Sequence, residues 1–300
     1  MGPARILLTA IVDYAGLFPP SKLPMEQVVS NYAEYRASPH AWMLGRIVVP
    51  ISRLEEFESC VSGRLPSDQM AEPWSITALV GEDLDADIDT IFDFNVRHAE
   101  PGAGLAVIDA IELRADGPRA VDRDMQVIPE QITPYFEIPP DGEVRGLLTA
   151  LAGTGGRAKI RCGGVTPDAF PTSEAIAEFI AMCAASDLSF KATAGLHHPV
   201  RSEQNLTYEQ DSPRGVMHGF LNVFLAAAFI RRGRMPTEDA VGLLNETDPE
   251  AFRISDESIS WHEYSLDAAR IASVRESFAI SFGSCSFQEP VDDLLALKTI

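Results

Sequence analysis

Two lysines stand where the chain could bring amines together, either for chemistry on a carbonyl compound or for binding an anion. Lys159 and Arg161 alternate in one short apolar segment, Lys191 and Thr193 alternate in the next, and both segments run into glycine. Side chains alternate between faces along a β-strand, so each pair shares one face. Charged side chains are rarely buried unless they are paired or used. We therefore expect the two lysines to meet at one end of neighbouring parallel strands.

The lysine pair allows two kinds of chemistry. An amine attacks a carbonyl carbon only in its unprotonated form, which burial and a second nearby cation favour. Lys191 and Arg161 would supply that cation for Lys159. Alternatively, both lysines stay charged and hold an anionic group of the substrate. The sequence leaves imine (Schiff-base) formation and plain anion binding equally open.

Three carboxylates end other strand-like segments of the chain, namely Asp13, Glu112 and Glu137. If they face the same pocket as the lysines, they could hold a substrate and transfer protons. The alternative is that some of them form salt bridges with no catalytic role. We expect catalysis or direct substrate contact for Glu112 and Glu137, and a substrate contact for Asp13.

Glycine and small polar residues follow two of the strand-like segments. Gly195 follows one, and Gly283, Ser284 and Cys285 follow another. Backbone amides there, near a helix N-terminus, could cradle an anion, and a tight turn without ligand explains the glycines equally well. A helix N-terminus could make Cys285 a catalytic thiolate, although a small buried residue is the more common role. Arg46, on an earlier strand, could grip a substrate carboxylate.

Two adjacent histidines, His197 and His198, come directly after the second lysine segment. They point in different directions along an extended segment, so joint metal chelation is awkward. We expect His197 to bind substrate or relay a proton, and His198 to contact substrate. A metal site formed by His197 with Glu112 and Glu137 is the rival hypothesis. Because no HxH or HExxH spacing supports it, no cofactor and no metal ligand are assigned.

These residues need a scaffold that gathers strand ends, and the chain alternates strand-like and helix-like segments. That alternation indicates parallel β-α-β units, and 300 residues suit one α/β domain of the (β/α)8, or TIM, barrel class. We expect strands at 6–13, 43–50, 75–80, 106–113, 134–138, 158–162, 188–194 and 277–282. Segment 258–263 competes for the eighth strand, but 277–282 leads into a better helix start. Residues 1–300 then form a single domain, with a helical and hairpin insertion at about 237–276 before the last strand.

The chain carries 24 Lys and Arg against 44 Asp and Glu, a formal net charge of −20. Acidic surfaces repel nucleic acid and anionic membranes, so neither is expected as a partner, and an anionic substrate would need a local basic site. The four cysteines form no CxxC pair. Neither a signal peptide nor an apolar run of membrane-spanning length is recognisable, which favours the cytoplasm. Assembly into a homo-oligomer is left open.

The two lysine segments resemble class I aldolases of the deoxyribose-phosphate aldolase type. In that family the Schiff-base lysine lies on barrel strand six in a Lys-Thr-Ser-Thr-Gly run, and a second lysine lies on strand seven in a Lys-Ala-x-Gly-Gly run. Lys159 corresponds to the first by position, although its segment reads Lys-Ile-Arg-Cys-Gly, and Lys191, in Lys-Ala-Thr-Ala-Gly, is similar to the second. Segments 190–199 and 282–287 also resemble those of uncharacterised bacterial barrel proteins, which supports the fold alone.

These features predict a barrel enzyme that acts on a small anionic carbonyl or sugar-like metabolite by lyase or aldolase chemistry. Lys159 would form the imine with Lys191 beside it. Glu137 or Glu112 would move protons, and His197 would bind or relay them. The expected substrate contacts are Arg161, Thr193, Gly195, His198, Gly283, Ser284, Cys285, Asp13 and Arg46. Two alternatives are a metal-dependent hydrolase or isomerase with histidine and glutamate ligands at the barrel mouth, and a non-catalytic barrel that binds a small ligand.

Overall fold

Eight parallel strands close into a barrel in the computed structural model, which describes residues 1–68, 70–139 and 143–300. Neighbouring strands follow the order β1-β13-β7-β6-β5-β4-β3-β2, so the first and last strands in sequence pair with each other. The strands are β1 (Val12–Tyr14), β2 (Leu44–Pro50), β3 (Trp74–Leu79), β4 (Ala106–Arg114), β5 (Thr133–Glu137), β6 (Arg157–Arg161), β7 (Phe190–Thr193) and β13 (Ala279–Ser284). The predicted (β/α)8 barrel is confirmed.

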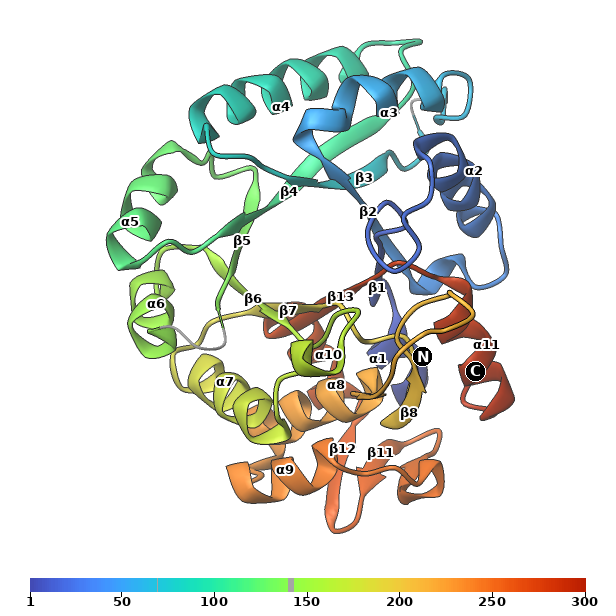
Figure 1. The fold of residues 1–300 in the computed structure, drawn as a ribbon, viewed down its shortest axis with the longest axis vertical. Coiled ribbons are helices and arrows are strands. Elements are labelled where there is room, and N and C mark those ends of the chain that lie inside the picture. Colours follow the sequence, from blue (N-terminus) through green and yellow to red (C-terminus); the bar gives the residue numbers. More distant parts are fainter. Residues whose placement is uncertain (69, 140–142) are drawn as a thin grey trace.

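Helices form a ring outside the strands, and the strands enclose the centre of the view (Figure 1). They are α1 (Pro3–Leu8), α2 (Met25–Arg36), α3 (Leu54–Val61), α4 (Leu84–Ala99), α5 (Pro118–Val127), α6 (Val144–Leu151), α7 (Ser173–Ala185), α8 (Phe220–Ala228), α9 (Thr237–Leu244), α10 (Ala268–Ser277) and α11 (Gln288–Ala296). Local capping fixes several starts. The side chains of Thr172 and Asp83 accept the backbone N–H of Ala175 and Ala86, each at 3.2 Å, at the starts of α7 and α4.

The main errors of the sequence prediction lie at the first strand and between β4 and β5. The chain from Pro3 to Leu8 is a helix, with proline at its first position, and only Val12 and Asp13 of the expected strand 6–13 belong to β1. Leu7 and Leu8 are buried, so the apolar run reflects a packed helix face rather than a strand. Helix α5 was not anticipated, because its buried side chains include only Ala120 and Val121.

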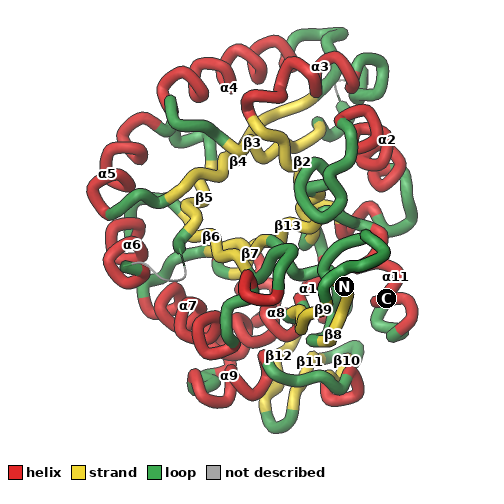
Figure 2. Tube along the Cα trace, viewed as in Figure 1, coloured by secondary structure: helices red, strands yellow, loops and turns green. Residues whose placement is uncertain are grey.

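The eighth barrel strand is β13, as expected, and it hydrogen-bonds to β1 and β7. The competing segment forms β11 (Ser258–Trp261) in an antiparallel sheet with β10 (Phe252–Ile254) and β12 (Tyr264–Asp267). This sheet and α9 extend outward beyond α8 (Figures 1 and 2). A second hairpin, β8 (Ser202–Asn205) with β9 (Arg214–Met217), follows β7.

Apolar packing between the barrel and its helices forms the core. Every residue of α8 is buried, and Phe220 from this helix stacks on Phe282 of β13 with ring centroids 5.0 Å apart. The alternating inward side chains of the strands fill the barrel interior in this fold class, which leaves room for polar chemistry only near the strand ends. In the part of the chain that the structure describes, no helix is both long and apolar enough to cross a bilayer.

Candidate functional site

Strand register places the charged residues of β5, β6 and β7 at one level of the barrel. The Cα atom of Lys159 pairs with that of Glu137 on one side and with that of Lys191 on the other. Glu112 lies near the end of β4, and Asp13 lies in the middle of β1. Because neighbouring parallel strands hold equivalent residues side by side, these five side chains converge within the barrel.

A continuous chain of ion pairs links the five side chains. The Nζ of Lys159 lies 2.7 Å from Oε2 of Glu112 and 2.7 Å from Oε2 of Glu137. The Nζ of Lys191 lies 2.7 Å from Oε1 of Glu112 and 2.5 Å from Oδ2 of Asp13. Glu112 therefore bridges the two lysines through its two oxygens. The groups against the Lys159 nitrogen are carboxylates, where the sequence suggested a cluster of cations.

The inner half of this network is almost completely shielded from water. The Lys191 side chain is 0% exposed, and its carboxylate partner Asp13 also accepts a hydrogen bond of 2.7 Å from the Ser281 hydroxyl. Burial alone would lower the pKa of Lys191, but Asp13 and Glu112 raise it above its ordinary value. Burial alone would likewise raise the pKa of Glu112, but the two ammonium groups lower it to about 2. Lys191 and Glu112 are thus both charged at neutral pH.

A cavity of about 910 Å³ opens above the network at the carboxyl ends of the strands. Its lining includes nine of the residues singled out from the sequence, which are Glu112, Glu137, Lys159, Arg161, Thr193, Gly195, His197, Gly283 and Cys285. Lys191 and Asp13 lie outside this lining. Lys159 is therefore the lysine that a compound in the cavity can reach, while Lys191 acts from within the barrel wall.

Two further cations line the cavity that sequence reasoning missed. Arg114 is the last residue of β4, as Arg161 is the last residue of β6. Arg123 lies on α5. Arg114 lies two residues after Glu112 on the same strand, and this alternation could have indicated its place. Arg123 had no such signal, because its helix was not anticipated. Three arginines thus line the cavity, together with acids that include Asp116 and Asp124.

On the same rim, Cys285, His197 and Glu289 form a second hydrogen-bonded chain. The Cys285 Sγ lies 3.8 Å from Nε2 of His197, and Nδ1 of His197 lies 2.7 Å from Oε2 of Glu289. The Tyr208 hydroxyl donates a 3.0 Å hydrogen bond to the other Glu289 oxygen. Glu289 was not among the residues singled out from the sequence, since nothing local links it to a histidine 92 positions away in the chain.

These contacts change the pKa values of all three groups. Burial would lower the pKa of His197, but its hydrogen bonds to Cys285 and Glu289 raise it to about 10. Burial would raise the pKa of Cys285, but the hydrogen bond and the charge of His197 lower it below its ordinary value. The pKa of Glu289 also falls, because His197 outweighs the effect of burial. His197 is therefore a cation at neutral pH, and it shifts the Cys285 equilibrium towards the thiolate.

Four expected substrate contacts lie elsewhere. The Arg46 guanidinium forms two hydrogen bonds with Asp109, of 2.7 and 2.8 Å, and does not line the cavity. His198 pairs with Asp293 at 2.6 Å and lines a separate cavity of about 480 Å³. Ser284 is buried, and its hydroxyl accepts the backbone N–H of Ser286 at 3.3 Å. The fourth, Asp13, holds Lys191 as described above.

Backbone geometry accounts for Gly195 at the end of β7. Its φ is +68°, in the left-handed region, and the preceding Ala194 has φ +58°. A Cβ on Gly195 would lie 2.8 Å from the Cα of Gly163, where the chain leaves β6. Close approach of two strand ends therefore requires glycine here, whether or not an anion binds.

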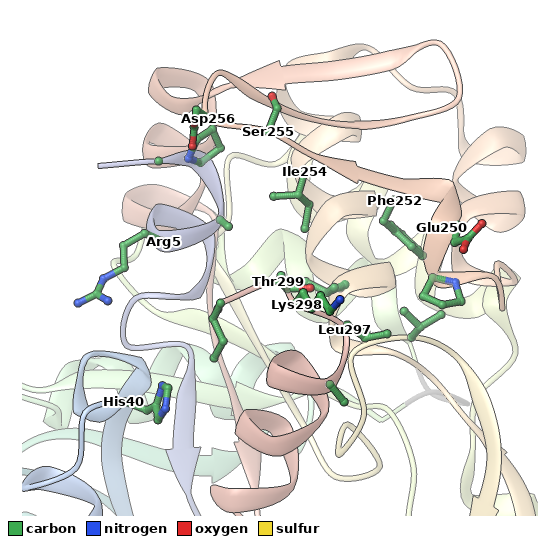
Figure 3. Close-up of a pocket in the computed structure, with 18 of the residues that line it drawn as sticks. Arg5, His40, Glu250, Phe252, Ile254, Ser255, Asp256, Leu297, Lys298 and Thr299 are labelled. Carbon is green, nitrogen blue, oxygen red and sulfur yellow. The ribbon is translucent and has the colours of Figure 1, made fainter.

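Another cavity lies away from the lysines, where both chain termini meet the segment around β10 (Figure 3). Its volume is about 1060 Å³. Charged residues such as Arg5 and Glu250 lie at opposite ends of it, and Arg5 stacks over the Trp42 ring at 3.8 Å. Convergent polar groups, the mark of a reactive site, are a feature of the cavity above Lys159 instead.

Within residues 1–68, 70–139 and 143–300, no group of three or more His, Cys, Asp or Glu side chains is arranged to hold a metal ion. Glu112 is engaged by two ammonium groups, and His197 is engaged by Cys285 and Glu289, so the donors of the rival metal hypothesis point to other partners. No protein-family model matches the chain, and no curated protein matches it. Interpretation of the site therefore depends on its geometry.

Proposed function

We propose that the protein is a lyase of the aldolase type, in which Lys159 forms an imine with a small anionic carbonyl metabolite. The observation that carries the proposal is the unequal placement of the two lysines. Lys159 borders the cavity with a carboxylate on either side, whereas Lys191 is buried beneath it and bonded to Glu112 and Asp13. This difference supports a covalent role for Lys159 and an electrostatic role for Lys191.

The first step requires Lys159 to lose a proton. Glu112 and Glu137 each lie 2.7 Å from its nitrogen and can accept that proton. Glu137 suits the role better, because its side chain is 24% exposed and Glu112 is held by a second lysine. The free amine then attacks the carbonyl carbon, the glutamic acid returns its proton to the departing hydroxyl, and loss of one water molecule gives the protonated imine.

The imine then withdraws electrons from the neighbouring carbon–carbon bond. A carboxylate removes the proton of the substrate's β-hydroxyl, the bond breaks, and its electron pair moves into the imine to give an enamine. Protonation of the enamine carbon and hydrolysis release the second carbonyl product and restore Lys159. Lys191 stays protonated throughout and holds Glu112 in its orientation, because its raised pKa keeps it a cation.

The proposed substrate class follows from the charges around the cavity. Arg114, Arg123 and Arg161 present guanidinium groups that bind carboxylate or phosphate oxygens. The protein as a whole carries a net charge of −20, so these local cations are what would retain an anion near Lys159. A small keto acid or sugar phosphate fits both the charge and the reaction.

Reductive trapping tests the proposal. The full-length protein is treated with borohydride and each member of a panel of small aldehydes, keto acids and sugar phosphates, and peptides are analysed by mass spectrometry. We expect one or more compounds to leave a reduced adduct on Lys159 and none on Lys191, because Lys191 is shielded from the cavity. Lys159→Met should abolish the adduct.

The control is an exposed lysine of the same chain, Lys22, which measures non-specific reductive alkylation. An adduct on Lys159 that exceeds that on Lys22 at low carbonyl concentration supports the imine. Equal labelling of both lysines by every compound, or no labelling of Lys159 at all, would overturn the aldolase proposal.

A further inference from the structure

We propose that Cys285, His197 and Glu289 form a second reactive centre on the cavity rim, in which Cys285 is a nucleophile for acyl transfer from small activated esters or thioesters. The arrangement is a nucleophile, a base within reach of it and a carboxylate that orients the base. This activity goes beyond the aldolase proposal and does not depend on it.

Three elements hold the centre in place. Cys285 directly follows β13, Glu289 lies in the first turn of α11, and His197 lies between β7 and β8. The carboxylate of Glu289 receives hydrogen bonds from both His197 and Tyr208, so it fixes the ring from the side away from the sulfur. His197 Nε2 is thereby directed at the thiol, 3.8 Å away.

The titratable groups that face the sulfur favour its negative form. These groups are His197, Tyr208 and Tyr14. Glu289 and His198 influence the sulfur indirectly, because Glu289 binds His197 and the charge of His198 acts on Glu289. Burial raises the pKa of Tyr14 and of Tyr208, so both hydroxyls are neutral at ordinary pH. His197 is then the cation that faces the sulfur.

The centre is open to ligands although its members are mostly buried. Cys285 and His197 both line the cavity of about 910 Å³, and His197 also lines the neighbouring cavity of about 480 Å³. Cys285 is 5% exposed. A small acyl compound in the larger cavity can therefore reach the sulfur, while bulk water has limited access.

The proposed reaction balances without an outside reagent other than water. The Cys285 thiolate adds to the acyl carbon, and the carbon–oxygen or carbon–sulfur bond to the leaving group breaks. The leaving group takes the proton from His197, and the acyl group remains on sulfur as a thioester. His197, now neutral, takes a proton from water as that water attacks the thioester, which releases the carboxylic acid and restores the thiolate–imidazolium pair.

The other three cysteines provide internal standards. Cys60 is partly exposed, and burial raises its pKa. Cys162 and Cys183 are buried away from any cation strong enough to offset burial, which raises the pKa of Cys162 to about 12 and that of Cys183 further still. Cys285 is the member of this set whose surroundings lower the thiol pKa.

The first experiment measures alkylation of each cysteine by iodoacetamide between about pH 5 and pH 11, a range that extends on both sides of the ordinary thiol pKa. Peptide-resolved mass spectrometry gives an alkylation rate for each thiol at each pH. Each profile is normalised to its own plateau, because a buried thiol reacts slowly at every pH and an unnormalised rate could be mistaken for the effect of a raised pKa. We expect Cys285 to reach its plateau at a lower pH than Cys60. At about pH 6 its normalised rate should exceed that of Cys60, because the pKa of Cys285 lies below its ordinary value and that of Cys60 lies above.

Two variants test the roles of the partners. His197→Asn should move the Cys285 profile towards higher pH, and Glu289→Gln, which keeps the size of the orienting side chain, should move it by a smaller amount. Cys60→Ser is the matched control and should leave the Cys285 profile unchanged. A Cys285 profile that coincides with that of Cys60, or that ignores His197→Asn, would overturn the proposal.

The second experiment uses p-nitrophenyl acetate. We expect a burst of p-nitrophenolate equal to the protein concentration, with the acetyl group found on the Cys285 peptide, and Cys285→Ser should remove the burst. Acetyl groups found only on lysines would exclude the acyl-transfer role. Because the label is located by peptide, this outcome is distinct from failure of imine trapping on Lys159.

Discussion

Glu112 is the residue on which the charged network depends, because its two oxygens hold both lysines. Glu112 and Glu137 pair with Lys159, and Glu112 and Asp13 pair with Lys191. Three carboxylates therefore face two ammonium groups within the barrel. Removing one member of a buried ion pair leaves the other without a counter-charge, which costs more than the pair itself contributes. The network is thus strongly coupled, and Glu112 keeps its charge until the pH falls towards 2.

Glu112→Gln should lower the free energy of unfolding by about 3–5 kcal/mol at neutral pH. The pKa of Glu112 falls from 4.5 to about 2 on folding, so its carboxylate stabilises the fold above pH 4.5 and loses that effect as pH falls towards 2. The difference between wild type and variant should therefore shrink by about 3 kcal/mol over that interval. Urea unfolding at several pH values measures it.

Glu56→Gln is the matched control, because Glu56 pairs with Arg53 on the exposed surface and should show little change at any pH. A stability gap between wild type and Glu112→Gln that stays constant down to pH 2 would contradict the charge network described for Glu112.

At the scale of elements, the ends of β6, β7 and β13 decide what reaches the cavity. The chain after β7 turns through two left-handed residues, Ala194 and Gly195, and passes within contact distance of Gly163. That turn directs His197 towards Cys285 and Glu289. A non-glycine side chain at the turn would displace one strand end from the other.

Gly195→Ala should destabilise the protein by about 2–4 kcal/mol, which combines a left-handed backbone penalty with overpacking against Gly163. Gly153→Ala isolates the first term, because Gly153 has φ +79° and nothing within 4 Å of its added Cβ. That control should cost about 1–2 kcal/mol. Equal losses for both variants in urea unfolding would show that the contact with Gly163 contributes nothing.

Hydrogen bonds join the barrel and its helices α7 and α8 to the segment between α8 and β13. The Asn222 side chain on α8 donates to the carbonyl oxygens of Leu243 and Glu246 at 2.8 and 2.9 Å. The Ser173 hydroxyl on α7 donates to Oδ1 of Asn245 at 2.7 Å. These contacts would cost free energy if the two parts separated, so we predict that residues 1–300 unfold as a single domain.

Tryptophan fluorescence can test that prediction, because Trp74 lies in β3 and Trp261 lies in β11 on the added sheet. One variant keeps Trp74 alone, and the other keeps Trp261 alone, with phenylalanine at the remaining tryptophans. In each, the fluorescence midpoint in urea should coincide with the far-ultraviolet circular dichroism midpoint. A Trp261 transition that precedes the loss of secondary structure would show that the outer segment unfolds independently.

The sequence by itself was enough to predict the barrel and most of the residues that line the cavity at the carboxyl ends of its strands. Apolar runs with period two, separated by helical segments, are local patterns, and in a parallel barrel they place residues such as Lys159, Glu137 and Arg161 at one end. The first strand was misplaced, because the apolar run at Pro3–Leu8 packs as a helix that cannot be told from a strand by its composition.

Only the tertiary structure decided how those side chains are partnered. It placed Lys191 beneath Lys159, joined both to Glu112, engaged Arg46 with Asp109 and brought Glu289 to His197 across 92 positions of sequence. Ion pairs and hydrogen bonds of this kind form over less than 4 Å, and which side chains come that close depends on barrel closure and helix packing. No pattern along the chain encodes those distances.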